Sequence, residues 1–199
     1  MSSLLDMVRD AIDDRVVKRT ASELGTSPDL AQNAIETALP LLVGALGRNA
    51  AEPQGAQSLF NALHKDHGSS QPTDVLSSVL GGGGLGDGMK ILGHIFGGRQ
   101  QRAEQGVSQM SGLDGATAAK LMAMLAPVIM SVLANRSRQQ NMGPSDLSGL
   151  LGGEKRRIEE HSGAGGLMNA VLDRDGDGDV DFADIAQNVS MLGSLFGRR

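Results

Sequence analysis

Apolar side chains recur every three or four positions at the start of the chain. In residues 4–24 they stand at Leu4, Leu5, Val8, Ile12, Val16 and Val17, a spacing that places them on one face of a helix. Gly25 ends this predicted helix. The next helix starts at Ser27-Pro28, because serine is a good cap and proline fits the first turn. The pattern therefore predicts one continuous helix over residues 4–24, followed by a second helix.

The second predicted helix contains a proline in its apolar run, and this arrangement recurs later in the chain. Aligning Pro40 with Pro127 pairs residues 15–46 with residues 102–133 without a gap. The identical pairs are Arg15/Arg102, Gly25/Gly112, Ala31/Ala118, Pro40/Pro127 and Leu46/Leu133. Each segment predicts a helix, a glycine turn and an apolar helix that its proline kinks or divides. Duplication of a helical unit explains this best, although shared helix-turn-helix patterning would give a similar alignment.

Glycine-rich and polar stretches divide the chain into predicted parts. Residues 68–72 and 81–84 favour linkers, and the apolar period fades over residues 135–153. We predict a first helical unit over 1–67, a linker over 68–90, a second helical unit over 91–153 and a C-terminal segment over 154–199. A shorter echo pairs ILGHIFG at residues 91–97 with MLGSLFG at residues 191–197.

The composition predicts an all-α fold. The chain has 28 Gly and 4 Phe but no Trp or Tyr, and the β-branched and aromatic runs of a sheet are missing. A net charge of −5 without a long basic run argues against nucleic acid as a partner. No Cys is present, which excludes disulfides and thiolate metal sites. We also expect no signal peptide and no transmembrane segment, hence a cytoplasmic protein.

Residues 173–184 have the pattern of a calcium-binding loop of the EF-hand type. Such a loop provides oxygen ligands from positions 1, 3, 5, 7, 9 and 12, and a glycine at position 6 makes the sharp turn. Gly178 stands at position 6, and the six ligand positions are Asp173, Asp175, Asp177, Asp179, Asp181 and Asp184. So many carboxylates in one loop would repel one another without a cation. We therefore predict a Ca²⁺ site, with Mg²⁺ as an alternative ion.

The last ligand position departs from the usual pattern because it holds Asp184 in place of glutamate. The shorter side chain reaches the ion less easily, which resembles the calcium loops of dockerins and puts the affinity in question. The alternative interpretation is an acidic surface turn. EF-hands usually pair, yet the rest of the chain has no second Asp-rich loop.

Other candidate sites are weaker. Residues 84–90 (GLGDGMK) resemble a phosphate loop but lack the Gly-Lys-Ser/Thr ending and a preceding strand. His64 and His67 could share a helix face as zinc ligands, but no third ligand stands at metal spacing. No nucleophile-elbow motif frames a serine. We therefore expect no enzymatic activity, and we expect the ten Met residues to fill the core more than to form a binding surface.

Several segments together resemble the YidB-like family of small helical bacterial proteins of unknown function. They are residues 91–98, 112–114, 125–130 and 172–178, and the resemblance runs from about Leu4 to Asp184. It implies an all-α fold and no catalytic residues.

Two functions follow as hypotheses. The first is a calcium-binding protein in which the metal orders the C-terminal helix, through Phe182, Ile185, Val189 and Leu192. The second is a self-assembling, homo-oligomeric scaffold whose loop is only a structural clip.

Overall fold

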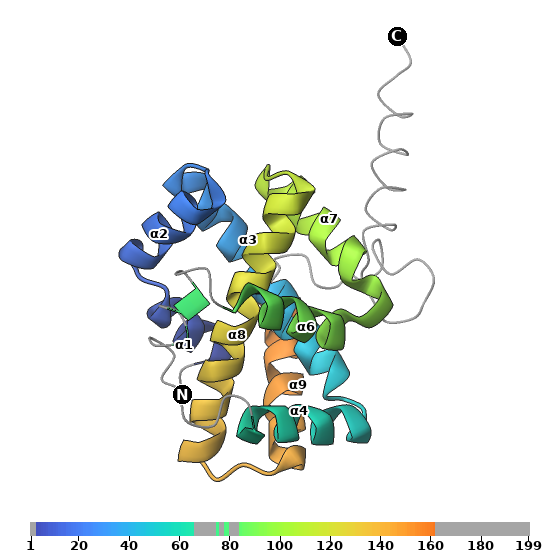
Figure 1. Ribbon diagram of the computed structural model, residues 1–199. Coiled ribbons are helices and arrows are strands. Elements are labelled where there is room, and N and C mark those ends of the chain that lie inside the picture. The colour runs from blue at the N-terminus through green and yellow to red at the C-terminus, as the bar shows by residue number, and fades with distance from the viewer. Residues whose placement is uncertain (1–2, 66–74, 76–77, 80–83, 162–199) are drawn as a thin grey trace. The chain divides into compact units, whose positions relative to one another are not determined.

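The computed structural model describes residues 3–65, 75, 78–79 and 84–161, and within them the chain is all-α, as predicted. The helices are α1 (Leu4–Ala11), α2 (Asp14–Leu24), α3 (Pro28–Asn49), α4 (Pro53–Lys65), α6 (Leu85–Phe96), the short 3₁₀ helix η1 (Gly97–Arg99), α7 (Gln100–Ser111), α8 (Gly115–Gln139) and α9 (Pro144–His161) (Figure 1). The chain divides into two compact units, Met1–Arg156 and Arg157–Arg199. The packing described below lies within the first.

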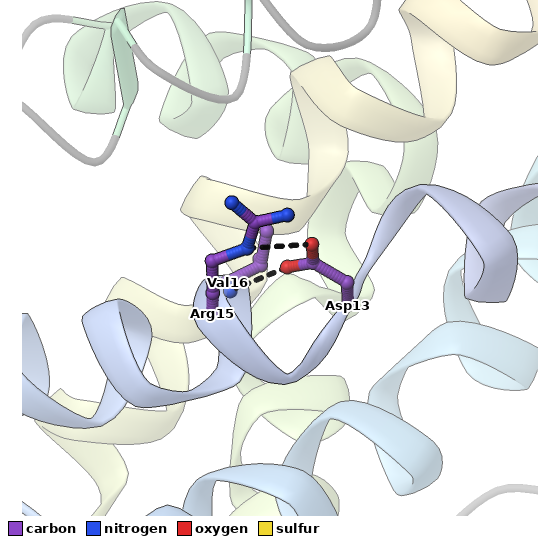
Figure 2. A network of polar contacts seen from close by, with 3 residues as sticks. All are labelled: Asp13, Arg15 and Val16. Carbon is purple, nitrogen blue, oxygen red and sulfur yellow. Dashed lines mark hydrogen bonds and ion pairs between the residues drawn. The ribbon is translucent and has the colours of Figure 1, made fainter.

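The prediction of one helix over residues 4–24 is wrong, because the chain breaks between α1 and α2. Asp13 has an extended backbone and caps α2, where its carboxylate accepts a hydrogen bond from the Val16 amide at 3.0 Å. The same carboxylate lies 3.4 Å from Nε of Arg15 (Figure 2). A short acidic side chain that satisfies the first free amides favours a new helix start over continuation. The apolar spacing is compatible with both arrangements, so it does not reveal the break.

The two predicted repeat segments fold in the same way. Helix α2 ends at Gly25, whose φ is 68°, and α7 ends at the aligned Gly112, whose φ is 79°. Such left-handed positions favour glycine, which has no Cβ. Ser27 then caps α3, and at the aligned position Asp114 caps α8 by accepting from the Thr117 amide at 3.0 Å. The aligned sequences therefore place the same helix ends at corresponding residues.

Both long helices run through their internal prolines, so the prolines do not divide them. Proline has no amide N–H, and Pro127 therefore leaves the Ala123 carbonyl without its usual donor within the helix. Gly88 of α6 packs against this carbonyl. A Cβ built on Gly88 would lie 1.9 Å from the Ala123 oxygen, so glycine is what allows α6 to approach α8 here.

Helix α8 forms the centre of the first unit. Helices α2 and α7 each pack on both α3 and α8. Helices α1, α4 and α6 also contact α8. Met122, Met124 and Met130 of α8 are buried, as expected for core methionines. By length and composition α8 could cross a membrane, but most of its apolar window is buried in this core, and core helices of bundles meet the same criterion.

Two regions expected to lack regular structure contribute to the core. Helix α6 starts at Leu85, inside the predicted linker, and Val79 packs against Met124 and Val128. The prediction that the helical pattern fades over residues 135–153 is wrong, because α9 begins at Pro144 and buries Leu147 and Leu151 completely. Among the described apolar side chains of α9, the fully buried ones are these two leucines, one helical turn apart, and so short an apolar pattern is easily missed.

Candidate functional site

The described residues form an apolar groove of about 370 Å³ where α3, α4, α6 and α8 meet. Its apolar lining comprises Leu46, Leu59, Ala62, Ile91, Ile95 and Met130. The side chains of Ile91 and Ile95 lie on successive turns of α6, as do those of Ser58 and Ala62 on α4. Two helices therefore provide the walls, and the C-terminal end of α3 and the middle of α8 complete the lining.

Two backbone contacts hold the walls of the groove in place. The Asn49 side chain at the end of α3 donates a hydrogen bond from Nδ2 to the His94 carbonyl of α6 at 3.1 Å. On α4, Gly55 lies so close to the end of α3 that an added Cβ would be 1.9 Å from the Asn49 carbonyl oxygen. A side chain at Gly55 would push α4 away. The groove therefore depends on an amide side chain and a glycine at one corner.

The described lining of this groove is mostly apolar, with a few polar groups at its edge. Its described polar lining consists of neutral amide and hydroxyl groups from Asn49, Gln54 and Ser58, together with His94. No carboxylate, lysine or arginine is among the described lining residues. Such a surface can hold an apolar group and give its edge a few hydrogen bonds.

The predicted calcium ligands, Asp173, Asp175, Asp177, Asp179, Asp181 and Asp184, lie outside the described residues. Within the described part of the chain, no group of three or more His, Asp or Glu side chains is arranged to hold a metal ion. The calcium site therefore stays a prediction from the sequence.

The weaker candidates have ordinary structural roles where they are described. Lys90 Nζ lies 3.0 Å from an Asp87 carboxylate oxygen within α6, so its charge is already matched in the suspected phosphate loop. The His64 ring packs on Phe60 with a centroid separation of 4.1 Å, and Nδ1 lies 3.0 Å from the Phe60 carbonyl. His67, the other half of the suspected zinc pair, is outside the described residues.

The sequence did not reveal the groove. Spacings of four in α4 and α6 signal apolar faces, but they equally fit faces that are buried entirely in a core.

Two charged side chains, Arg136 of α8 and Glu154 of α9, are also buried, at 8% and 3% exposure. Both take part in polar interactions, among them a contact of 3.2 Å from Arg136 to the Met7 sulfur. Neither residue is among the described lining of the groove.

Comparison with known proteins gives one match. Residues 6–136 match the family model described as "Bacterial protein of unknown function (DUF937)". Neither a curated protein nor a solved structure matches the chain. The match confirms the expectation of a bacterial family of unknown function, over a shorter range than the resemblance indicated, and it does not include the loop at residues 173–184.

Proposed function

We propose that this chain, which belongs to the bacterial DUF937 family of unknown function, is a non-enzymatic calcium-binding helical protein. An EF-hand-like loop orders the C-terminal helix when it binds the ion, and the helical unit serves as the support. The observation that carries the proposal is the loop sequence, which has aspartate at all six ligand positions and glycine at the turn.

The charge of the loop supports a cation as its partner. Residues 173–184 contain seven acidic or basic side chains, of which only Arg174 is basic. Oxygen ligands of this kind suit the hard cations Ca²⁺ and Mg²⁺. Because the ligands must be brought together against their mutual repulsion, ion binding and ordering of the loop are coupled.

The helical body supports a binding role. Its described groove offers apolar surface with a few polar groups, a lining that suits an apolar side chain.

Isothermal titration of Ca²⁺ into chelator-stripped protein tests the proposal, with Mg²⁺ as competitor. We expect saturable binding that Asp173→Ala abolishes. Asp10→Ala, which removes an equally charged but exposed side chain of α1, serves as the matched control and should bind normally. Absence of binding at millimolar Ca²⁺, or equal binding by both variants, would contradict the proposal.

Ordering of the C-terminal helix is a separate consequence. Adding Ca²⁺ should raise the helix content and slow proteolysis after Gly166, because a segment that is held in place is cut less easily. Adding a chelator should reverse both effects. Unchanged helix content and cleavage would leave an ion site that orders nothing.

A self-assembling scaffold is the second candidate, and one surface feature favours it. Met110 of α7 is 65% exposed and Met89 of α6 is 44% exposed, and methionine adapts readily to a partner surface. Light scattering over a range of concentrations distinguishes the candidates. A strict monomer, with and without Ca²⁺, would exclude the scaffold.

A further inference from the structure

We propose that one face of α3 pairs with the same face of a second copy of this chain, in an antiparallel contact with two-fold symmetry. The residues that carry the inference are Glu36, Pro40, Gly44 and Arg48, which all lie in the described first unit. The inference gives the scaffold candidate an interface, and it does not depend on the calcium loop.

This face of α3 is open in the described part of the chain. Glu36 and Arg48 are exposed, and Pro40 and Gly44 are partly exposed. A Cβ built on Gly44 meets no described atom within 4 Å, whereas Leu42, on the opposite side of the helix, is completely buried. The backbone of another helix can therefore approach α3 closely at Gly44.

A backbone carbonyl on this face lacks its usual donor. Pro40 has no amide N–H, so the Glu36 carbonyl receives no hydrogen bond from the fourth residue along the helix. Within this chain, the corresponding carbonyl of Ala123 in α8 is met by Gly88 of α6, where an added Cβ would lie 1.9 Å from the oxygen. Helix α3 provides both parts of such a contact itself, because Gly44 follows Pro40 by one turn.

The face is self-complementary in one antiparallel register. When Pro40 lies opposite Gly44 of the second copy, the two-fold axis passes at the level of Leu42. Glu36 and Arg48 are also equally distant from this level along the sequence. The same register therefore places Glu36 of each copy opposite Arg48 of the other, as a two-fold contact requires.

Helix geometry permits this pairing. Residues 36, 40, 44 and 48 form one row with a spacing of four, and such rows align when two helices cross at about −50°. In the middle of the row, proline and glycine leave little volume between the backbones. A parallel pair in register would instead place Glu36 opposite Glu36 and Arg48 opposite Arg48, so the charges select the antiparallel arrangement.

The two charged side chains can form these pairs while they keep their contacts within the chain. Glu36 accepts a hydrogen bond from Gln32 Nε2 at 3.0 Å, and Arg48 also has a polar interaction in its own chain. A carboxylate has about four lone-pair sites and a guanidinium five N–H donors, so each can bind a further group. Because the contact is confined to one helix face, we expect a reversible dimer that salt weakens.

Charge reversal in the full chain tests the proposal, measured by sedimentation velocity from about 10 µM to about 1 mM protein. We expect the wild type to dimerise as its concentration rises. Glu36→Arg alone and Arg48→Glu alone should stay monomeric, because like charges then oppose each other twice. An equimolar mixture of these two variants should dimerise again, because each contact then joins one basic and one acidic side chain. Arg19→Glu, at an exposed position of α2, should dimerise like the wild type.

A second variant tests the close approach at the centre of the contact. Gly44→Gln adds a neutral side chain where the chain itself leaves room, so the fold should be retained. Dimerisation should weaken by about tenfold or more, because the added volume separates the backbones. Gly149→Gln is the matched control, since Gly149 is an exposed glycine of α9 whose added Cβ also meets no described atom within 4 Å. It should leave dimerisation unchanged.

The outcomes separate this inference from the calcium function. A wild type that stays monomeric, or dimers that persist in both single charge variants, would overturn pairing through α3. A mixture that does not dimerise would overturn the antiparallel register. Titration of Ca²⁺ into the same samples reports the loop independently. A monomer that binds Ca²⁺ therefore overturns the pairing alone, and a dimer that binds none overturns the calcium function alone.

Discussion

Close approaches between helices are decided by single residues. At Gly88, α6 meets the carbonyl that Pro127 has left without its helical donor, so a proline in one helix and a glycine in another act at one contact. The carbonyl is fixed in the backbone of α8 and cannot give way as a flexible side chain would. This contact therefore tolerates very little added volume.

Replacing Gly88 with alanine should destabilise the protein by about 1–3 kcal/mol, the usual cost of overpacking. Gly86 provides the control on the same helix, because a Cβ there meets nothing within 4 Å. Gly86→Ala should instead stabilise by about 0.5–1 kcal/mol by restricting the unfolded chain. Urea unfolding followed by far-UV circular dichroism measures both. Equal effects of the two changes would show that α6 does not approach α8 so closely.

The helix caps make stability depend on pH at the residue scale. The Val16 amide, with help from Arg15, holds the pKa of Asp13 below its ordinary value (Figure 2). The hydroxyl and amide of Thr117 do the same for the pKa of Asp114. A lowered pKa in the folded state means that the carboxylate form stabilises the fold.

This stabilisation is present above the ordinary pKa and is lost as the pH falls through the lowered pKa of the folded state. Unfolding free energies at about pH 6 and about pH 3 should therefore differ more for the wild type than for the double variant Asp13→Asn, Asp114→Asn. Asparagine retains capping ability without a charge, so the helices still start at these residues. An equal loss in both proteins would contradict a role for the carboxylates.

At the scale of elements, the paired helices α2–α3 and α7–α8 show how repeated local signals are used. Each pair has a glycine with positive φ followed by a side-chain cap. The hydrogen bonds of these signals join residues only a few positions apart. Helix α9 is different, because Leu147 and Leu151 stabilise it only when they are buried against other helices.

Leu147→Ala should therefore destabilise the protein by about 2–5 kcal/mol, as is usual for a fully buried leucine. Leu150, on the same helix but only partly buried, is the matched control. The same truncation there should cost clearly less, since less apolar surface is lost. Chemical denaturation of the two variants gives the comparison. Similar losses at both positions would mean that α9 does not pack through Leu147.

At the scale of the molecule, the two repeat segments are interleaved. Helix α7 of the second segment packs on α3 of the first, and α2 packs on α8. Lys120 of α8 also donates a hydrogen bond to the Glu23 carbonyl at the end of α2, at 2.6 Å. Neither segment buries its apolar helix alone.

A fragment of residues 1–65 should therefore be largely unfolded, because Leu39 and Leu42, almost fully buried in the whole chain, would lose most of their cover. A fragment of residues 1–161 should stay helical and unfold in one cooperative transition. Circular dichroism with thermal melting measures both. A cooperatively folded short fragment would show that the first segment is an independent domain.

The sequence alone determined the features that depend on neighbouring residues. The all-α class, the turns at Gly25 and Gly112, and the repeated helix starts follow from local hydrogen bonding and backbone preference. The calcium loop rests on the same kind of local pattern, because a loop of fixed length gathers its own ligands, but it lies outside the described residues and stays a prediction. Only the tertiary structure revealed the break at Asp13, the buried face of α9 and the groove. For α9 and the groove, the apolar spacing fits more than one packing, and contacts between residues distant in sequence select one of them. The break at Asp13 has a local cause, the cap on the Val16 amide, which the apolar spacing does not reveal.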